Sequence, residues 1–393
     1  MLKKIIILSL TVFIFISSVS LLWGESHPSI SMELYNTVYR GEDDWYFAGS
    51  GRASLHMKSA RDPNVQGAVV VDFMPFDLTG VSSSASESTV DVTKAYVKVR
   101  FPGMKMTLGK TRLAWGDGIV FNSGDILFGS LNPLLDLTQS ELRSETAWLT
   151  AINIPLGPFA FLEMVALPPG IDMSDSEDPA AGDISRASGG CRAYFTVLNT
   201  KLEIGYLYKG EEKVALDVIG HRPYLSMQGN VGPDWYMATS AAFVTEQQRN
   251  EGNDAGWEDS WNLSFGLFHM QEAGRNNTLN LRLEALCFPY QNWEDQGGRH
   301  SIYGLYLYPE LTWLQGSSLS YSLRSVISPL DGSAMITGGA CWNIFQGLIL
   351  QAYASFFTGD ETDTYAWDRG SVWDDDLDRI QGASFMMGAR YTY

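Results

Sequence analysis

The sequence predicts an all-β fold, a transmembrane antiparallel up-and-down β-barrel of about 18 strands, with about 16 as the alternative count. Three observations lead to this prediction. Runs of alternating apolar and polar residues recur along the chain, short turns alternate with long acidic connections, and the last residue, Tyr393, ends an alternating run. A closed barrel that crosses a membrane on strands accounts for all three, because no backbone edge is left open to lipid.

The chain begins with a segment typical of a secretory signal peptide, residues 1–24. Lys3 and Lys4 precede an unbroken apolar run that starts at Ile5, and small residues follow it. A basic, an apolar and a small-residue region in that order predict an export signal. A retained membrane-spanning helix is the alternative, since the run is near the lower length limit for one. We expect a single outer-membrane barrel from residues 25–393.

Charge and cysteine content exclude several classes of function. The formal net charge is −18, so binding to nucleic acid is disfavoured, because phosphate contacts need a basic surface. Cys191, Cys287 and Cys341 are far apart and odd in number, and their spacing matches neither a metal site nor a disulfide framework. We therefore expect small buried hydrophobic residues at these positions, and no cofactor.

The strand signal is a strict alternation of side chains. Residues 278–288 place Leu281 and Leu283 on one face, and Arg282 and Glu284 on the other. Residues 261–267 and 319–324 repeat the pattern, with amides, hydroxyls, glycine or charge opposite the apolar face. Because side chains of a strand alternate between its two faces, such runs predict one face against lipid or a core and one face in water.

The connections between these runs alternate in length. Tight turns are expected at residues 101–104, 155–157, 198–200, 230–234, 273–277 and 314–318. The intervening connections are mostly longer and acidic, as in residues 168–188, 246–260 and 358–379. Short turns on one side and long loops on the other are typical of an outer-membrane barrel, and both termini fall on the short-turn side. The lower strand count applies if the weak hairpin around residues 209–220 is absent.

The last strand continues the alternating pattern and resembles the final strand of a known class of proteins. Phe385, Met387, Tyr391 and Tyr393 share one face of the terminal run. In this the chain resembles bacterial outer-membrane β-barrels of the general porin-like class, whose final strand commonly ends on an aromatic residue. The resemblance implies that these four residues form an assembly signal for the barrel assembly machinery. From the barrel pattern we expect contact with outer-membrane lipid in a diderm bacterium, as a single barrel or a homotrimer.

The connection formed by residues 116–144 is unusually apolar for an outside loop, with ten large apolar side chains between Ile119 and Leu137. We expect it to fold into the barrel, because so much apolar surface is unfavourable in water. Thr138 and Glu141 fit a capping box for a short helix. The loop resembles the constriction loop of general porins. A surface cap or a subunit contact made by the same residues is the alternative.

The charged residues predict a constriction with acids on one side and bases on the other. Four acids would enter the lumen with the loop: Asp117, Asp125, Asp136 and Glu141. Six bases would form a basic wall: Arg52, Lys94, Lys98, Arg112, Arg282 and Arg324. Such an arrangement creates a transverse field that filters ions and orients polar solutes. For any single base an ion pair within the wall is the alternative, and near Gly109 the alternation that places Arg112 changes phase, as at a bulge.

We therefore expect an outer-membrane channel for passive diffusion of small polar solutes or ions. The alternative is an occluded barrel that acts as an adhesin, a structural protein or an anchor for surface polysaccharide. An outer-membrane hydrolase is the weakest hypothesis, because no catalytic motif surrounds the histidines, and His269 and His300 are the pair to inspect. The acidic segments 359–363 and 373–378 could bind Ca²⁺ or Mg²⁺ through their carboxylates, but they lack the spacing of a calcium loop, so we expect solvated loops and assign no metal site.

Overall fold

The computed structural model describes most of the chain after the first 26 residues. The described ranges are 27–40, 45–59, 64–77, 90–138, 142–143, 145–169, 186–210, 220–245, 256–274, 276–295, 302–360, 362–367 and 381–393. The predicted signal peptide lies outside these ranges, and so do Glu141, His300 and the acidic segment 373–378.

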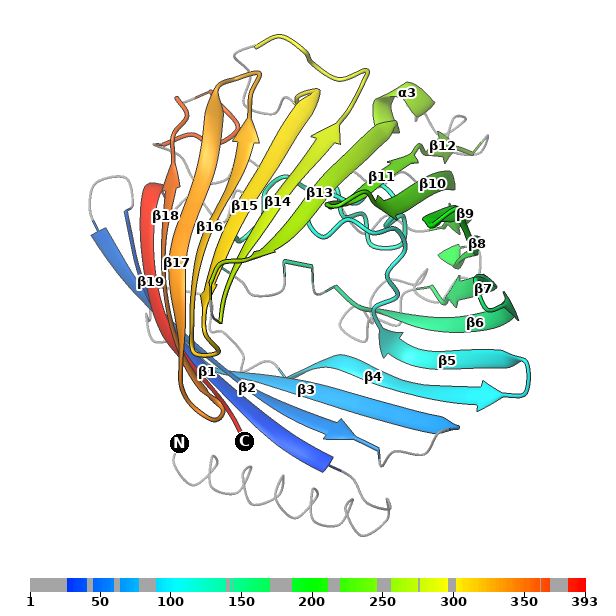
Figure 1. Cartoon of the computed structure of the whole chain (residues 1–393), viewed down its shortest axis with the longest axis horizontal. Coiled ribbons are helices and arrows are strands. Elements are labelled where there is room, and N and C mark those ends of the chain that lie inside the picture. Colours follow the sequence, from blue (N-terminus) through cyan, green and yellow to red (C-terminus); the bar gives the residue numbers. More distant parts are fainter. Residues whose placement is uncertain are drawn as a thin grey trace.

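Nineteen strands and one four-residue helix make up the described secondary structure (Figure 1). The strands are β1 (His27–Arg40), β2 (Trp45–Lys58), β3 (Val65–Asp77), β4 (Val90–Phe101), β5 (Met104–Thr111), β6 (Ala147–Gly157), β7 (Ala160–Leu167), β8 (Ser188–Val197), β9 (Thr200–Lys209), β10 (Gly220–Asn230), β11 (Asp234–Ser240), β12 (Phe243–Val244), β13 (Asn262–Glu272), β14 (Asn277–Cys287), β15 (Leu305–Gln315), β16 (Leu319–Ser328), β17 (Ser333–Phe345), β18 (Leu348–Phe357) and β19 (Gln381–Thr392). The helix is α3 (Trp257–Ser260), and no helix of the described ranges is long and apolar enough to cross a membrane.

The strands form one closed antiparallel barrel. Consecutive strands pair with each other, except that β11 pairs with β13 past the short β12. The ring closes because β1 pairs with both β2 and β19, from Ser31 opposite Thr392 to Arg40 opposite Gln381. Eighteen strands form the ring, while the two-residue β12 pairs beside β10. The prediction of about 18 strands is confirmed. The lower count is wrong, because β9 and β10 are both present and pair with each other.

The outer face of the barrel is apolar. On β1, the alternate residues Ile30, Met32, Leu34 and Val38 are exposed, while Glu33 between them is buried. On β19 and directly after it, the exposed large side chains are those of Phe385, Met387, Tyr391 and Tyr393, the residues of the predicted assembly signal. Because the same face continues around a closed sheet, these side chains point away from the barrel, and the polar alternates face the lumen.

The register of β5 with β4 and β6 runs through Gly109 without a shift, so the change of phase expected there, as at a bulge, is absent, although the backbone of Gly109 is unusual. Its φ of +122° is a conformation that other residues rarely adopt, and an added Cβ would lie 2.0 Å from the carbonyl oxygen of Ala95. The strand ends two residues later at Thr111, so Arg112 begins the long connection to β6. Arg112 is therefore a residue of the inward loop.

This connection between β5 and β6 lies inside the barrel, as predicted, and crosses it in Figure 1. Two apolar clusters hold it there. The first joins Val120, Phe121 and Leu137 of the loop to inward residues of β14–β17, including Leu286 and Tyr308. The second joins the loop residues Trp115, Ile126 and Leu127 to inward residues of β6–β10: Leu149, Ala151, Val165, Leu207 and Tyr224. The inward loop (residues 112–146) thus packs against two separate stretches of the wall.

The native cysteines provide a test of which face meets water. Cys341 pairs with Ser320 on the inner face of β17, whereas Cys191 and Cys287 are on outer faces, next to the inward Arg192 and Glu284. In proteoliposomes, a charged methanethiosulfonate should modify Cys341, because lipid shields the other two thiols. Mass spectrometry would locate the adduct, and Cys341→Ser is the control. Modification of Cys191 or Cys287 in place of Cys341 would contradict the assignment of faces.

Candidate functional site

A buried carboxylate on the wall binds the tip of the inward loop. Glu284 of β14, which is 1% exposed, accepts hydrogen bonds from three consecutive backbone amides, those of Ile119 (3.3 Å), Val120 (2.9 Å) and Phe121 (2.8 Å). From β11, the hydroxyl of Tyr236 donates to the carbonyl oxygen of Phe121 at 2.9 Å. The loop backbone could not otherwise be buried, because its donors would lose water without a replacement partner.

A second anchor lies on β7–β9, where Arg192 is paired with two buried acids. Its Nε is 2.9 Å from Glu163, and its Nη1 is 3.1 Å from Glu203. The loop completes this network: Trp115 Nε1 donates to Glu163 at 2.9 Å, and the amide of Gly116 donates to Glu203 at 3.1 Å. Removing one member of a buried ion pair typically costs about 3–5 kcal/mol, so this anchor fixes the start of the loop.

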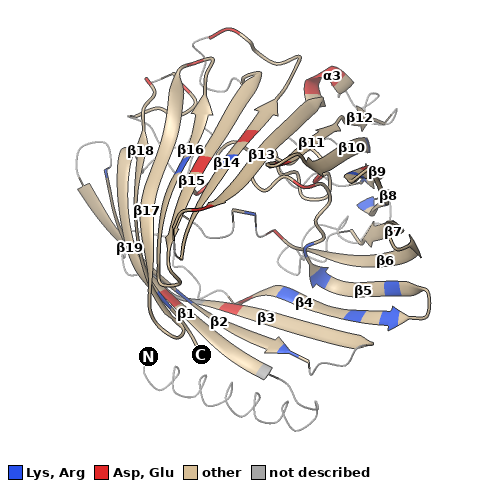
Figure 2. Ribbon diagram, viewed as in Figure 1, with Lys and Arg blue, Asp and Glu red and all other residues tan. Residues whose placement is uncertain are grey.

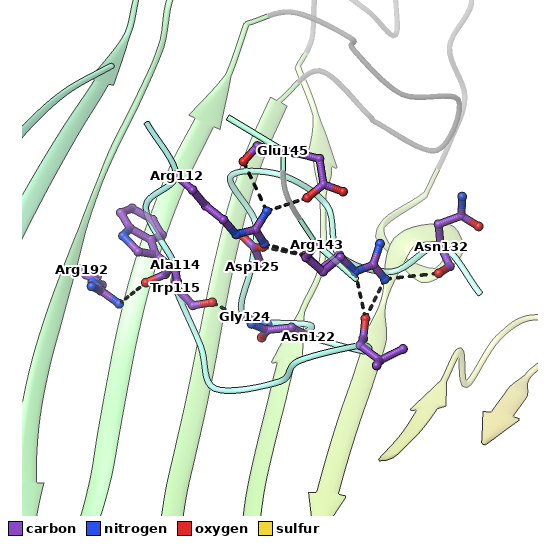
Figure 3. Close-up of polar contacts among 12 residues, drawn as sticks. Arg112, Ala114, Trp115, Asn122, Gly124, Asp125, Asn132, Arg143, Glu145 and Arg192 are labelled. Atoms are coloured by element: carbon purple, nitrogen blue, oxygen red, sulfur yellow. Dashed lines mark hydrogen bonds and ion pairs between the residues drawn. The ribbon is translucent and has the colours of Figure 1, made fainter. Parts of the chain in front are cut away.

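The loop is also braced internally (Figure 3). Arg112 contacts the carboxylates of Asp125 at 2.6 Å and Glu145 at 2.5 Å, and so joins the two ends of the loop. Arg143 donates to the carbonyl oxygens of Val120 at 2.6 Å and Asn132 at 3.3 Å. These contacts make the described part of residues 112–145 a compact insert that occupies a fixed place inside the barrel.

The predicted acids of the constriction have different environments. Asp125 is 2% exposed, so its side chain lies inside the loop and not at a lumenal edge. Asp136 is exposed and accepts hydrogen bonds from the amide and hydroxyl of Thr138. Asp117 is half-buried, and burial, followed by the negative charge of Glu203, raises the pKa of its carboxyl. Glu141 lies outside the described residues.

The predicted bases divide into two groups. Arg112, Arg282 and Arg324 hold the loop and its wall. Arg324 Nε is 3.1 Å from Glu310, and its Nη1 donates to the carbonyl oxygen of Leu137 in the loop at 3.1 Å. Arg282 is 3.8 Å from the same Glu310. For these three bases, the alternative of an ion pair describes the geometry better than a free lumenal charge.

The second group of bases is exposed or partly exposed to solvent, and its members lie on β2, β4 and β5. Arg52, Lys94 and Lys98 share the inner face with three bases that the sequence analysis missed, and we call the six the basic strip: Arg52, Lys58, Lys94, Lys98, Arg100 and Lys105. Arg52 pairs with Glu33 at 2.8 Å, whereas the other five form no ion pair with any described residue. Figure 2 shows Lys and Arg along β4 and β5, with Asp and Glu on β14 and β15.

The histidines give little support to a hydrolase. On the inner face, Ser31 Oγ lies 3.2 Å from His56 Nε2, but no carboxylate of the described residues hydrogen-bonds the imidazole to orient it. His269 belongs to the outer face of β13, and its proposed partner, His300, lies outside the described residues. Within the described ranges, no group of three or more potential ligands is placed to hold a metal ion.

The chain matches no protein-family model and no curated protein by sequence. Solved structures do resemble it. The outer membrane protein OpdK from Pseudomonas aeruginosa has a TM-score of 0.54 and 12% identity, over 93% of this chain and 98% of that one. OccK2 (OpdF) from the same organism, in complex with glucuronate, has a TM-score of 0.56 and 10% identity, over 94% and 98%.

A third similar structure is Wzi, an Escherichia coli outer membrane protein described as a carbohydrate-binding β-barrel involved in group 1 capsule assembly. It has a TM-score of 0.54 and 10% identity, over 92% of this chain and 83% of that one. Identities of this size establish the fold alone. The chain has the fold of the outer-membrane β-barrels.

Removing the Glu284 anchor should widen the lumen. In Glu284→Ala, the buried amides of Val120 and Phe121 lose their acceptor at about 1–3 kcal/mol each, and so does the partly buried amide of Ile119, so we expect the loop to leave the wall and single-channel conductance to rise. The matched control is Glu272→Ala, which removes an equal charge from the inner face of β13 without touching the loop. An unchanged conductance in folded Glu284→Ala would show that the loop does not restrict the lumen.

Asp117 should make the stability of the loop depend on pH. Because its pKa is raised, the ionised form is disfavoured in the folded loop, and this penalty appears as pH rises through the folded-state pKa. At about pH 7, Asp117→Asn should therefore slow amide hydrogen exchange in residues 116–124 relative to the wild type. At about pH 4 the difference should shrink. Asp136→Asn is the control, and equal protection of wild type and Asp117→Asn at both pH values would contradict the prediction.

Proposed function

We propose that the protein is an outer-membrane channel for passive diffusion of small polar solutes or ions, with its pore size set by residues 116–144. The observation that carries this proposal is the asymmetric filling of the barrel. The loop is bonded to β7–β9 and β13–β16 through buried partners. The basic strip, on β2, β4 and β5, is exposed or partly exposed. A wall of uncovered charge facing an immobilised insert is typical of a hydrated, narrowed path.

The electrostatics of this path favour anions. Five bases of the strip have no acidic partner among the described residues. Glu33 and Asp72 on the neighbouring inner face are both within reach of Arg52, and Asp91 of β4 lies 3.4 Å from Lys110. Across the lumen, Asp117 and Asp136 are the predicted constriction acids that keep some exposure. The transverse field then runs from the basic strip toward these two loop acids.

The loop and the strip have different roles in this proposal. Arg112, Arg282 and Arg324 position the loop, together with Asp125. The strip makes contact with the solute. The similar structures include channels and a carbohydrate-binding barrel, so conductance is the property that separates this proposal from an occluded surface barrel.

The last strand supports a proposal about assembly. Phe385, Met387 and Tyr391 lie on the outward face of β19, and Tyr393 follows the strand directly, beside β1, where the barrel closes. We propose that this face is recognised by the barrel assembly machinery before closure, and that lipid contacts it afterwards. Chemical crosslinking of the refolded protein would distinguish a single barrel from the homotrimer.

Neutralising the strip should change ion selectivity. In a planar bilayer with a salt gradient, the wild type should pass discrete, persistent currents that favour anions. The double variant Lys94→Gln and Lys98→Gln should shift the reversal potential toward cation selectivity, because two uncompensated positive charges leave the lumen. The matched control is Lys94→Arg with Lys98→Arg, which should keep the wild-type potential. The proposed channel would be refuted by folded wild-type protein that carries no current.

A further inference from the structure

A small cavity separates the inward loop from the rim of the barrel. It has a volume of about 50 Å³, is partly enclosed, and lies between loop residues 123–131 and the ends of β10, β11 and β13 where the long connections are attached. Its polar lining includes Ser123 and Asp125 from the loop, with Arg222, Ser240 and Asn262 from the wall. A solute that enters from the long-loop end meets this cavity beside the insert.

Two buried polar atoms that the loop contributes to the lining have no hydrogen-bond partner among the described residues. They are Ser123 Oγ and Asp125 Oδ1, in residues that are 1% and 2% exposed. The other carboxylate oxygen, Asp125 Oδ2, is fully used by Arg112 and Ser130. Buried polar atoms are nearly always hydrogen-bonded, so two such atoms in one cavity indicate an occupant that supplies their partners.

Hydrogen bonds among Ser240, Asn262 and Ser260 fix the geometry of the wall side of the cavity. Ser240 Oγ donates to Asn262 Oδ1 at 3.2 Å, and Asn262 Nδ2 donates to the carbonyl oxygen of Ser260 at 2.8 Å. The amide of Ser123 donates to Ser264 Oγ at 3.0 Å, which holds the serine in place independently of its own hydroxyl. The two atoms that need a partner are thus attached to a rigid frame.

The charges of the lining select neutral hydroxyl groups. A carboxylate oxygen requires a donor, and a serine hydroxyl can both donate and accept. A bare cation is opposed by Arg112 and Arg222, and a bare anion is opposed by Asp125. Two adjacent hydroxyl groups on one ligand satisfy both atoms without a net charge. One hydroxyl can donate to Asp125 Oδ1, while its neighbour donates to or accepts from Ser123 Oγ. The volume suits such a group, because a water needs about 10–15 Å³ by the same measure.

We propose that this cavity binds the vicinal-diol end of a neutral polyol or sugar. The inference rests on the proposed channel and names a solute class for it: the cavity would be a first selective contact at the outer side of the constriction. Binding here places the remainder of the polyol toward the open lumen, next to the loop.

Sorbitol binding to the refolded full-length protein in detergent micelles tests the proposal, measured by saturation-transfer NMR and titration. We expect saturable binding to the wild type, and binding about tenfold weaker in Ser123→Ala, which removes the hydroxyl and keeps the amide contact. Ser226→Ala is the matched control, because Ser226 Oγ is also buried without a partner but does not line the cavity. It should bind sorbitol as the wild type does. As a ligand control, 1-propanol should not compete.

Each outcome distinguishes the proposed diol site from the proposed channel function. No saturable sorbitol binding by a protein that conducts would overturn the diol site, leave the cavity to water alone, and leave the channel intact. Equal binding by the wild type and Ser123→Ala would place the polyol elsewhere and also overturn the site. Sorbitol binding that depends on Ser123, in a protein without conductance, would support the site and refute the channel.

Discussion

The closure of β19 on β1 is the constraint on which the rest of this structure depends. A strand edge in hydrocarbon would leave a row of amides and carbonyls without partners, so a sheet in lipid must form a ring. The register from Ser31 opposite Thr392 to Arg40 opposite Gln381 satisfies this requirement. Closure also assigns every strand side chain to one of two faces, because alternate residues then point outward or into the lumen.

That assignment explains why a long apolar connection can lie inside the barrel. The inner face provides Leu286, Tyr308 and Tyr224 as apolar partners, and it provides carboxylates where the loop presents its backbone. Glu284 binds three amides in succession, a geometry that resembles anion binding by backbone nests. The ionic groups on this wall are therefore used in positioning, whereas those of the basic strip remain available to water.

Burying carboxylates on the wall that holds the loop costs free energy, and the hydrogen-bond and ion-pair partners of these carboxylates offset that cost. A buried carboxylate is unfavourable unless it is paired and hydrogen-bonded, and Glu163 and Glu203 meet this condition through Arg192, Trp115 and Gly116. In Asp125 only one carboxylate oxygen, Oδ2, is paired and hydrogen-bonded, through Arg112 and Ser130. The remaining oxygen makes the cavity beside the loop chemically distinct from the rest of the buried lining.

Local patterns in the sequence determined the barrel, the strand number, the outward face of β19 and the inward course of the loop. They did so because alternation, turn length and apolar content are properties of neighbouring residues. The roles of the charges were decided by tertiary structure. Arg324 and Lys98 look alike in sequence, yet one meets Glu310 and Leu137 across the fold, and the other meets no described acid. Pairing between residues far apart in the chain depends on closure and register, which no local pattern contains.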